Sequence, residues 1–212
     1  MKFENTEVWG FEHAIRGMRN PLESWNKIDS CYVDKRFNDQ FHIGKNDLAL
    51  MQRLIKAGSE HRKFLRQIFV SVDITAPLYW WKEFDTYKIG TVTNSTSTMH
   101  KLASTPITMD YFEMGDFEDL RMFDISTVWE ILIFDLERLR KLYNATKDKR
   151  YWKELIRLLP ESWLQKRTIT MNYENILNMY QQRKNHKLIE WSKSFCDWVK
   201  TLPYAEELIC LE

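Results

Sequence analysis

The chain has 212 residues, which is enough for one domain with a sizeable buried core. Hydrophobic residues make up 44% of it and aromatic residues 14%, while 31 Lys and Arg against 30 Asp and Glu leave a formal net charge of +1. This balance excludes a general attraction of the whole chain to nucleic acid or to a membrane surface, so an anionic ligand has to be bound by local groups.

The cysteines and histidines give no pattern typical of a metal site. Cys31, Cys196 and Cys210 are widely spaced without a CxxC pair, and the five histidines show no HxH or HExxH spacing. No apolar run reaches the roughly 20 residues of a membrane helix, and the first residues lack the apolar core of a signal peptide. We therefore expect a cytoplasmic protein with no metal, no membrane and no nucleic-acid partner.

A helix, a strand and a second helix are predicted from residue 46 to residue 88. Helical spacing of apolar residues over 48–57 predicts a helix that Asn46 or Asp47 caps and Gly58 ends. From 67 to 75, apolar and other side chains alternate with the period of a strand that buries one face. Pro77 suits the first turn of a helix, which we expect to run from about 77 to 88.

The following stretch, from Gly90 to about Met114, lacks clear periodicity, and we expect a long, partly irregular excursion. Thr127 and Glu130 form a possible capping box for an amphipathic helix over 127–146. A second helix across 147–159 ends at Pro160. We expect these two helices to form an antiparallel hairpin.

After Pro160 the pattern predicts a short strand over 163–172 and helices over 173–185 and 186–200, with Asn172 as the N-cap of the first. We find neither a low-complexity linker nor an internal repeat. The sequence therefore predicts one α+β domain over 1–212, with a small antiparallel or mixed sheet and a majority of helices.

The loop "KIGTVTNSTSTMHK" (88–101) combines cations with hydroxyl groups. Hydroxyls, loop N–H groups and a cation such as Lys88 are what a phosphate needs, because each donates to its oxygens in fixed geometry. An exposed Ser/Thr loop stabilised by side-chain to backbone bonds explains the same composition. Both interpretations stay open at this stage.

The segment "YWWKEFDTY" (79–87) is dense in aromatic residues at helical spacing. This pattern is more typical of a core or subunit interface than of a stacking platform, with Tyr87 as the candidate exception. No GxSxG, P-loop or GxGxxG motif is present, so a serine hydrolase and a Rossmann-type site have no support.

Residues 74–100 resemble the signature region of the flavin-dependent thymidylate synthases. In that family a strand ending in I-x-A-P leads into an aromatic-bearing helix, an R-H-R triplet and a loop x-x-S-x-N-E-x-S-x-R-Y. Here "ITAP" (74–77) fits, Thr91 stands for the first Ser, and Asn94 and Ser97 suit the later Asn and Ser if one residue is inserted.

The resemblance covers roughly residues 46–100 and 155–200. Downstream, "LPESWLQKRTITMNYENILNMYQQR" is similar to the family's L-P-x-x-x-x-T segment and the helix that follows it. It implies flavin contacts for Asn172 and Asn178, and it implies that Arg183 is the catalytic, nucleotide-contacting arginine. A surface Arg near a helix C-terminus explains Arg183 equally well, and a helix cap explains Asn172.

The chain departs from the family where phosphates are bound. Thr86, Tyr87 and Lys88 replace R-H-R, so two guanidinium groups are reduced to one ammonium. Glu83 stands where the family has a nucleotide-contacting glutamine, and the loop arginine falls at Thr98 or Met99. The nucleotide pocket is therefore not a standard dUMP site.

The resemblance implies FAD-dependent methylation of dUMP, or of a close pyrimidine nucleotide, with methylenetetrahydrofolate and NADPH, in a homotetramer. It assigns Thr86, Tyr87, Lys88, Asn172 and Asn178 to the flavin. The substrate residues are Glu83, Asn94, Thr96, Ser97 and Arg183. Two alternatives remain open, namely a non-catalytic nucleotide-binding protein on the same scaffold and a purely structural oligomer.

Overall fold

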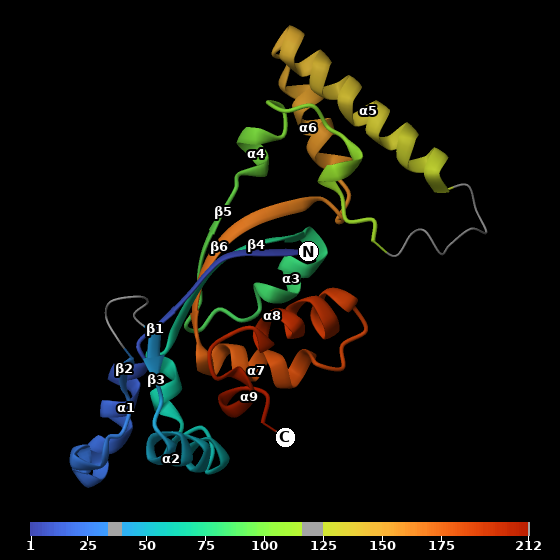
Figure 1. Cartoon of the computed structure of the whole chain (residues 1–212). Coiled ribbons are helices and arrows are strands. Elements are labelled where there is room, and N and C mark those ends of the chain that lie inside the picture. The colour runs from blue at the N-terminus through green and yellow to red at the C-terminus, as the bar shows by residue number, and fades with distance from the viewer. Residues whose placement is uncertain (34–39, 116–124, 212) are drawn as a thin grey trace. The chain divides into compact units, whose positions relative to one another are not determined.

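The computed structural model describes residues 1–33, 40–115 and 125–211 (Figure 1). It contains two compact units, each built from several chain segments. Unit 1 comprises Met1–Lys2, Ile74–Thr86 and Asn94–Arg167, and unit 2 comprises Phe3–Asp73, Tyr87–Thr93 and Thr168–Glu212. A single domain over 1–212 stays a prediction.

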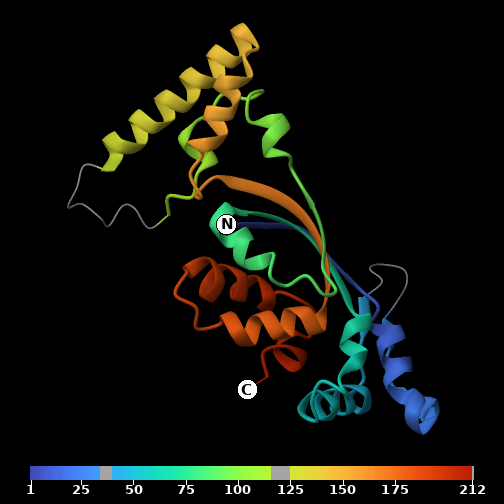
Figure 2. The same cartoon turned by 180° about the vertical axis from the view of Figure 1, so that it is seen from behind.

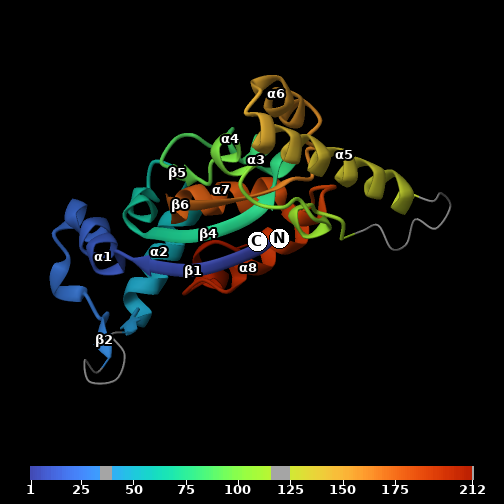
Figure 3. The ribbon, with the colours of Figure 1, turned by 90° about the horizontal axis from the view of Figure 1, so that it is seen from above.

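The strands confirm the small sheet that the sequence predicts. Four of them lie in the order β1-β4-β6-β5 (Figure 3): β1 Lys2–Trp9, β4 Phe69–Pro77, β6 Leu164–Asn172 and β5 Val92–Ser95. A separate antiparallel pair consists of β2 Cys31–Val33 and β3 Gln40–His42. The period-2 prediction is confirmed, because Val70, Val72 and Ile74 are fully buried while Phe69 is 38% exposed.

Unit 2 holds most of the helices at the two ends of the chain (Figure 2). They are α1 Phe11–Arg19, α2 Lys45–Lys56, α7 Tyr173–Arg183, a π-helical turn Glu190–Phe195, α8 Cys196–Lys200 and α9 Ala205–Leu208. The helices predicted from 46 and from 173 are thus confirmed. The elements of the first 45 residues, β1 and α1 among them, were not predicted.

The predicted cap of α2 was wrong, whereas that of α7 is confirmed. Helix α2 begins at Lys45, and the Asp29 carboxylate accepts hydrogen bonds from the N–H groups of Asn46 (2.8 Å) and Asp47 (3.0 Å). At α7 the Asn172 side chain accepts from the Asn175 N–H at 3.0 Å, and the Asn175 Oδ1 accepts from the Asn172 N–H at 3.2 Å. A cap supplied from a distant segment leaves no local sequence signal.

Unit 1 contains α3 Leu78–Phe84, α4 Thr98–Lys101, α5 Ile125–Thr146 and α6 Lys149–Arg157. Helices α5 and α6 form the predicted hairpin (Figure 1). Helix α5 already includes Ile125, so the predicted capping box at Thr127 was wrong. The expected excursion from Gly90 to about Met114 contains β5 and α4, and residues 116–124, which follow it, lie outside the described residues. The hairpin packs on one core cluster: Leu102, Ile107, Phe112, Leu136, Leu155 and Trp163.

Helix α3 ends at Phe84, four residues before the predicted end. The Thr86 hydroxyl donates to the Glu83 carbonyl at 2.7 Å and satisfies an acceptor that the next helical turn would have used. Trp80, Trp81 and Phe84 are at most 1% exposed and contact one another through their rings. These aromatic residues therefore belong to the core, one of the two environments predicted for them.

Among the described residues, no helix combines the length and the apolar character that crossing a membrane requires.

Candidate functional site

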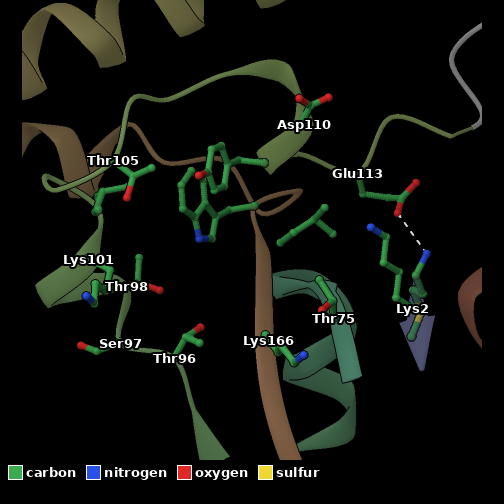
Figure 4. Close-up of a pocket in the computed structure, with 15 residues that line it drawn as sticks. Lys2, Thr75, Thr96, Ser97, Thr98, Lys101, Thr105, Asp110, Glu113 and Lys166 are labelled. Atoms are coloured by element: carbon green, nitrogen blue, oxygen red, sulfur yellow. Dashed lines mark ion pairs between the residues drawn. The ribbon is translucent and has the colours of Figure 1, made fainter. Parts of the chain in front are cut away.

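Unit 1 contains a cavity of about 550 Å³ at the junction of β5, α4 and β6 (Figure 4). Hydroxyl groups, Lys101 and Lys166 form one part of its wall, and carboxylates, aromatic rings and Lys2 form the rest. The lining includes Lys2, Thr75, Thr96, Ser97, Thr98, Lys101, Thr105, Asp110, Tyr111, Glu113, Trp163 and Lys166. A pocket of this size accommodates a nucleotide.

The hydroxyl-rich loop is held against β6. The Thr96 N–H donates to the Lys166 carbonyl at 2.9 Å, and Gln165 donates through Nε2 to the Thr96 carbonyl at 2.9 Å. The Ser97 hydroxyl oxygen accepts from the His100 N–H at 3.2 Å, as the side-chain to backbone interpretation predicts. Its own O–H remains a donor, so the two interpretations of this loop are compatible.

Lys101 and Lys166 supply positive charge to the cavity, and the family resemblance assigns no role to either residue. Lys101 lies three residues after Thr98 in α4, where the helical turn brings it to the same cavity. Lys166 reaches the cavity from β6, next to the residue that anchors the loop. Two ammonium groups beside three adjacent hydroxyls suit an anion with several oxygens.

Carboxylates occupy a different part of the wall, as Figure 4 shows for Asp110 and Glu113. Glu113 pairs with the α-amino group of Met1 at 3.5 Å and accepts from the Gly115 N–H at 2.9 Å. Lys2 lies beside Glu113 in this part of the wall, and the Asp110 carboxylate can accept hydrogen bonds. The cavity can therefore bind a ligand with an anionic end and a neutral, hydrogen-bonding end.

An aromatic pair closes the apolar side of the cavity. Tyr111 and Trp163 stack with their ring centroids 5.3 Å apart and an interplanar angle of 8°. Trp163 is only 9% exposed and also belongs to the core of unit 1. The wall is therefore rigid, because the core fixes the position of the indole ring.

In unit 2 the structure brings together Tyr87 and Arg183, two predicted site residues 96 positions apart. Arg183 donates through Nε to the Tyr87 hydroxyl at 2.9 Å, and that hydroxyl donates to Gln182 at 2.9 Å. The guanidinium carbon lies 4.8 Å from the ring centroid of Trp191 and 5.5 Å from that of Tyr87. Two aromatic rings thus fix the arginine.

Asn172 and its neighbour Asn175 lie against the turn that follows Lys88. Asn175 donates to the Ile89 carbonyl at 2.7 Å. A Cβ on Gly90 would come within 2.9 Å of Asn175 Oδ1 and 3.1 Å of Asn172 Nδ2, and Gly90 has φ +79°. These asparagines therefore position the Ile89–Gly90 turn, and a glycine is required there.

Asn178 is oriented by a charged network. Arg62 donates to Asn178 Oδ1 at 2.9 Å and pairs at 3.3 Å with Glu174, which also binds Arg66. Because Arg62 occupies the carbonyl oxygen, a ligand at Asn178 would meet the Nδ2 donor. No local pattern around Arg62 indicates this role.

Two of the other predicted residues line the cavity, and the rest lie outside it. Thr96 and Ser97 line it, but Asn94 is exposed on β5 and Glu83 is half-buried at the end of α3. The Thr86 hydroxyl is used at the end of α3, and Lys88 is exposed. The described residues contain no cluster of His, Cys, Asp and Glu that could hold a metal ion.

Solved structures give the fold a name. A crystal structure of flavin-dependent thymidylate synthase ThyX from Helicobacter pylori, complexed with FAD and dUMP, matches with a TM-score of 0.71 and 18% identity, covering 100% of both chains. A second structure of ThyX from that organism with FAD and dUMP matches with a TM-score of 0.69 over 99% of this chain and 97% of the other. The chain has the flavin-dependent thymidylate synthase fold.

Searches by sequence add nothing to this likeness. No protein-family model matches the chain. No curated protein matches it.

Proposed function

We propose that this chain binds FAD and a pyrimidine nucleotide and methylates dUMP, or a close analogue, with methylenetetrahydrofolate and NADPH. The observation that carries the proposal is the unit 1 cavity, in which Lys101 and Lys166 stand beside Thr96, Ser97 and Thr98. The fold supports it, because two solved structures of a protein of this fold contain FAD and dUMP. The sequence resemblance supports the same reaction.

The nucleotide phosphate is assigned to Lys101, Lys166 and the hydroxyls of residues 96–98. Lysine replaces arginine here, so the phosphate is bound by point charges rather than by bidentate guanidinium groups. Asp110 is placed to accept from an N–H or O–H group at the neutral end of the nucleotide. Glu83, Asn94 and Arg183 remain nucleotide-binding proposals that rest on the resemblance.

The donor set in unit 2 fits a flavin. Asn178 offers an oriented Nδ2 donor, and Lys88 offers an exposed ammonium for a phosphate. Thr86, Tyr87 and Asn172 remain flavin-binding proposals that rest on the resemblance. Reduced FAD would supply the electrons of the methylation, with NADPH as their source. The residues of this chain bind and orient the reactants and supply local charge.

The first test is the visible absorbance of the purified protein before and after addition of FAD and desalting. Retained flavin, followed by dUMP-dependent NADPH oxidation, is the expected result. A protein that keeps no flavin after reconstitution and oxidises no NADPH would refute the enzymatic proposal.

A matched pair of variants tests the phosphate site. Lys101→Gln should weaken dUMP binding about 10-fold or more and leave deoxyuridine binding unchanged, because only the phosphate loses a charge-assisted bond. Lys153→Gln, an exposed lysine on α6 of the same unit, is the control. An equal effect of Lys101→Gln on dUMP and deoxyuridine would contradict the assignment.

A non-catalytic nucleotide-binding protein is the second candidate. It is favoured by the triplet Thr86-Tyr87-Lys88, which lacks arginine, and by the packing of Arg183 against two aromatic rings. This candidate predicts a rise in melting temperature with dUMP but no retained flavin. A chain with neither response would instead fit a purely structural oligomer.

The assembly and location follow from the same proposal. We propose a homotetramer in the cytoplasm, and native mass spectrometry of the full chain tests the oligomeric state.

A further inference from the structure

Unit 2 contains a second cavity, of about 660 Å³, on one face of α2. Four cationic side chains and two amides surround a small apolar floor. The lining residues are Arg19, Lys27, Asn46, Ala49, Leu50, Gln52, Arg53 and Lys56. No carboxylate belongs to this lining.

A buried ion pair holds the walls of the cavity together. Arg19, 4% exposed at the end of α1, binds Asp47 Oδ1 through Nε at 2.7 Å and through a terminal nitrogen at 2.6 Å. Asp47 is fully buried on α2 and also accepts from the Ser30 hydroxyl at 2.6 Å. The pair is electrically balanced, so it fixes the geometry without adding net charge.

The other three cations that line the cavity lack a counter-ion of this kind among the described residues. Lys27, Arg53 and Lys56 are exposed, and the described parts of the chain contain no ion pair to any of them. Like charges gathered around one cavity repel unless an anion lies between them. Arg53 and Lys56 lie in the last turns of α2, where the helix dipole favours cations. This does not account for Lys27, which comes from the separate turn Trp25–Lys27.

We propose that this cavity binds the phosphate chain of a nucleotide with two or more phosphates. Three cations from two elements match a ligand with at least two negative charges, and the volume suits a nucleotide. Ala49 and Leu50 provide an apolar floor for a base. Gln52 donates through its amide nitrogen to the Glu207 carbonyl at 3.4 Å, which leaves its side-chain oxygen to accept from the ligand.

Isothermal titration calorimetry of the full chain with inorganic pyrophosphate, ADP and AMP tests this site. The double variant Arg53→Gln/Lys56→Gln should weaken pyrophosphate and ADP binding roughly 10-fold or more. Lys187→Gln/Lys200→Gln, two exposed lysines of the same unit, removes equal charge and should change neither affinity. AMP should bind more weakly than ADP to the unaltered chain, because it carries one phosphate fewer.

A further variant separates this cavity from the one in unit 1. Pyrophosphate should still bind to Lys101→Gln/Lys166→Gln, and dUMP binding should survive Arg53→Gln/Lys56→Gln. Absence of pyrophosphate binding to the unaltered chain would overturn the proposal. An equal loss of pyrophosphate affinity in Arg53→Gln/Lys56→Gln and in Lys187→Gln/Lys200→Gln would overturn it as well. Such a result would indicate a general attraction of the anion to positive charge rather than a site. Thermal melts of every variant check that a loss does not reflect unfolding.

Discussion

Replacing Asp47 by Ala should destabilise the protein more than any exposed charge removal. Asp47 is fully buried, and its carboxylate accepts hydrogen bonds from Arg19, from the Ser30 hydroxyl and from the N–H groups of Asp29 (3.0 Å) and Ser30 (3.1 Å). The substitution leaves the 4%-exposed Arg19 guanidinium without its counter-ion. The other donors also lose their acceptor.

Removing one partner of a buried ion pair costs about 3 to 5 kcal/mol. A typical free energy of unfolding is about 5 to 15 kcal/mol, so Asp47→Ala removes a large share of it. Urea unfolding followed by tryptophan fluorescence measures the loss. With a slope of about 1 to 3 kcal/mol per molar urea, the midpoint should fall by at least roughly 1 M.

The control is Glu154→Ala, which breaks the exposed 3.0 Å pair with Arg157. Exposed pairs contribute about 0 to 1 kcal/mol, so its midpoint should hardly move. The double variant Arg19→Met/Asp47→Leu should recover much of the stability, because no charge is left buried. An Asp47→Ala midpoint equal to that of Glu154→Ala, with an unchanged slope, would refute the reasoning.

Three further predictions concern other parts of the chain. A hydrogen bond from Arg140 lowers the pKa of Glu137 to about 2. Ionised Glu137 should therefore stabilise the folded state by at most about 3 kcal/mol, fully above pH 5 and progressively less as the pH falls towards 2. The free energy of unfolding, measured over this pH range, should depend less on pH in Glu137→Gln. Gly90→Ala should lower the melting temperature more than Gly58→Ala, because both glycines have positive φ but only a Cβ at Gly90 would meet the Asn172 and Asn175 side chains. Equal shifts in melting temperature would exclude this steric clash as the cause. Burial raises the pKa of the Cys196 thiol to about 11, so at pH 7.5 iodoacetamide should modify exposed Cys31 first, as peptide mass spectrometry can establish.

Local patterns predicted the elements of residues 46–88 and 127–200 well. The alternation that ends at Ile74 and the apolar spacing of α2 reflect which side of each element faces water. The order of residue types along the chain is enough to show this side. The ends of elements were less predictable. The Asp29 carboxylate caps α2 from 18 residues earlier in the chain, and the Thr86 hydroxyl ends α3 before its apolar pattern ends.

The candidate site was predicted in part. The hydroxyl loop indicated Thr96 and Ser97, which line the cavity, but nothing local marked Lys101 or Lys166 as their companions. Lysines are common on exposed surfaces, so their presence in a sequence carries little information about a site. The N-terminal strand β1 was also missed, because its side chains are mostly exposed and show no clear alternation.

The sequence by itself determined the α+β class, most helices and strands after residue 45, and the resemblance to one enzyme family, since all three depend on short-range order of residue types. Only the tertiary structure decided which side chains meet. Pairing of β5 with β6 brings Lys166 to the hydroxyl loop, and the packing of α7 places Arg183 on Tyr87. Such contacts join residues about 70 to 100 positions apart, and chain order alone does not encode distances in space.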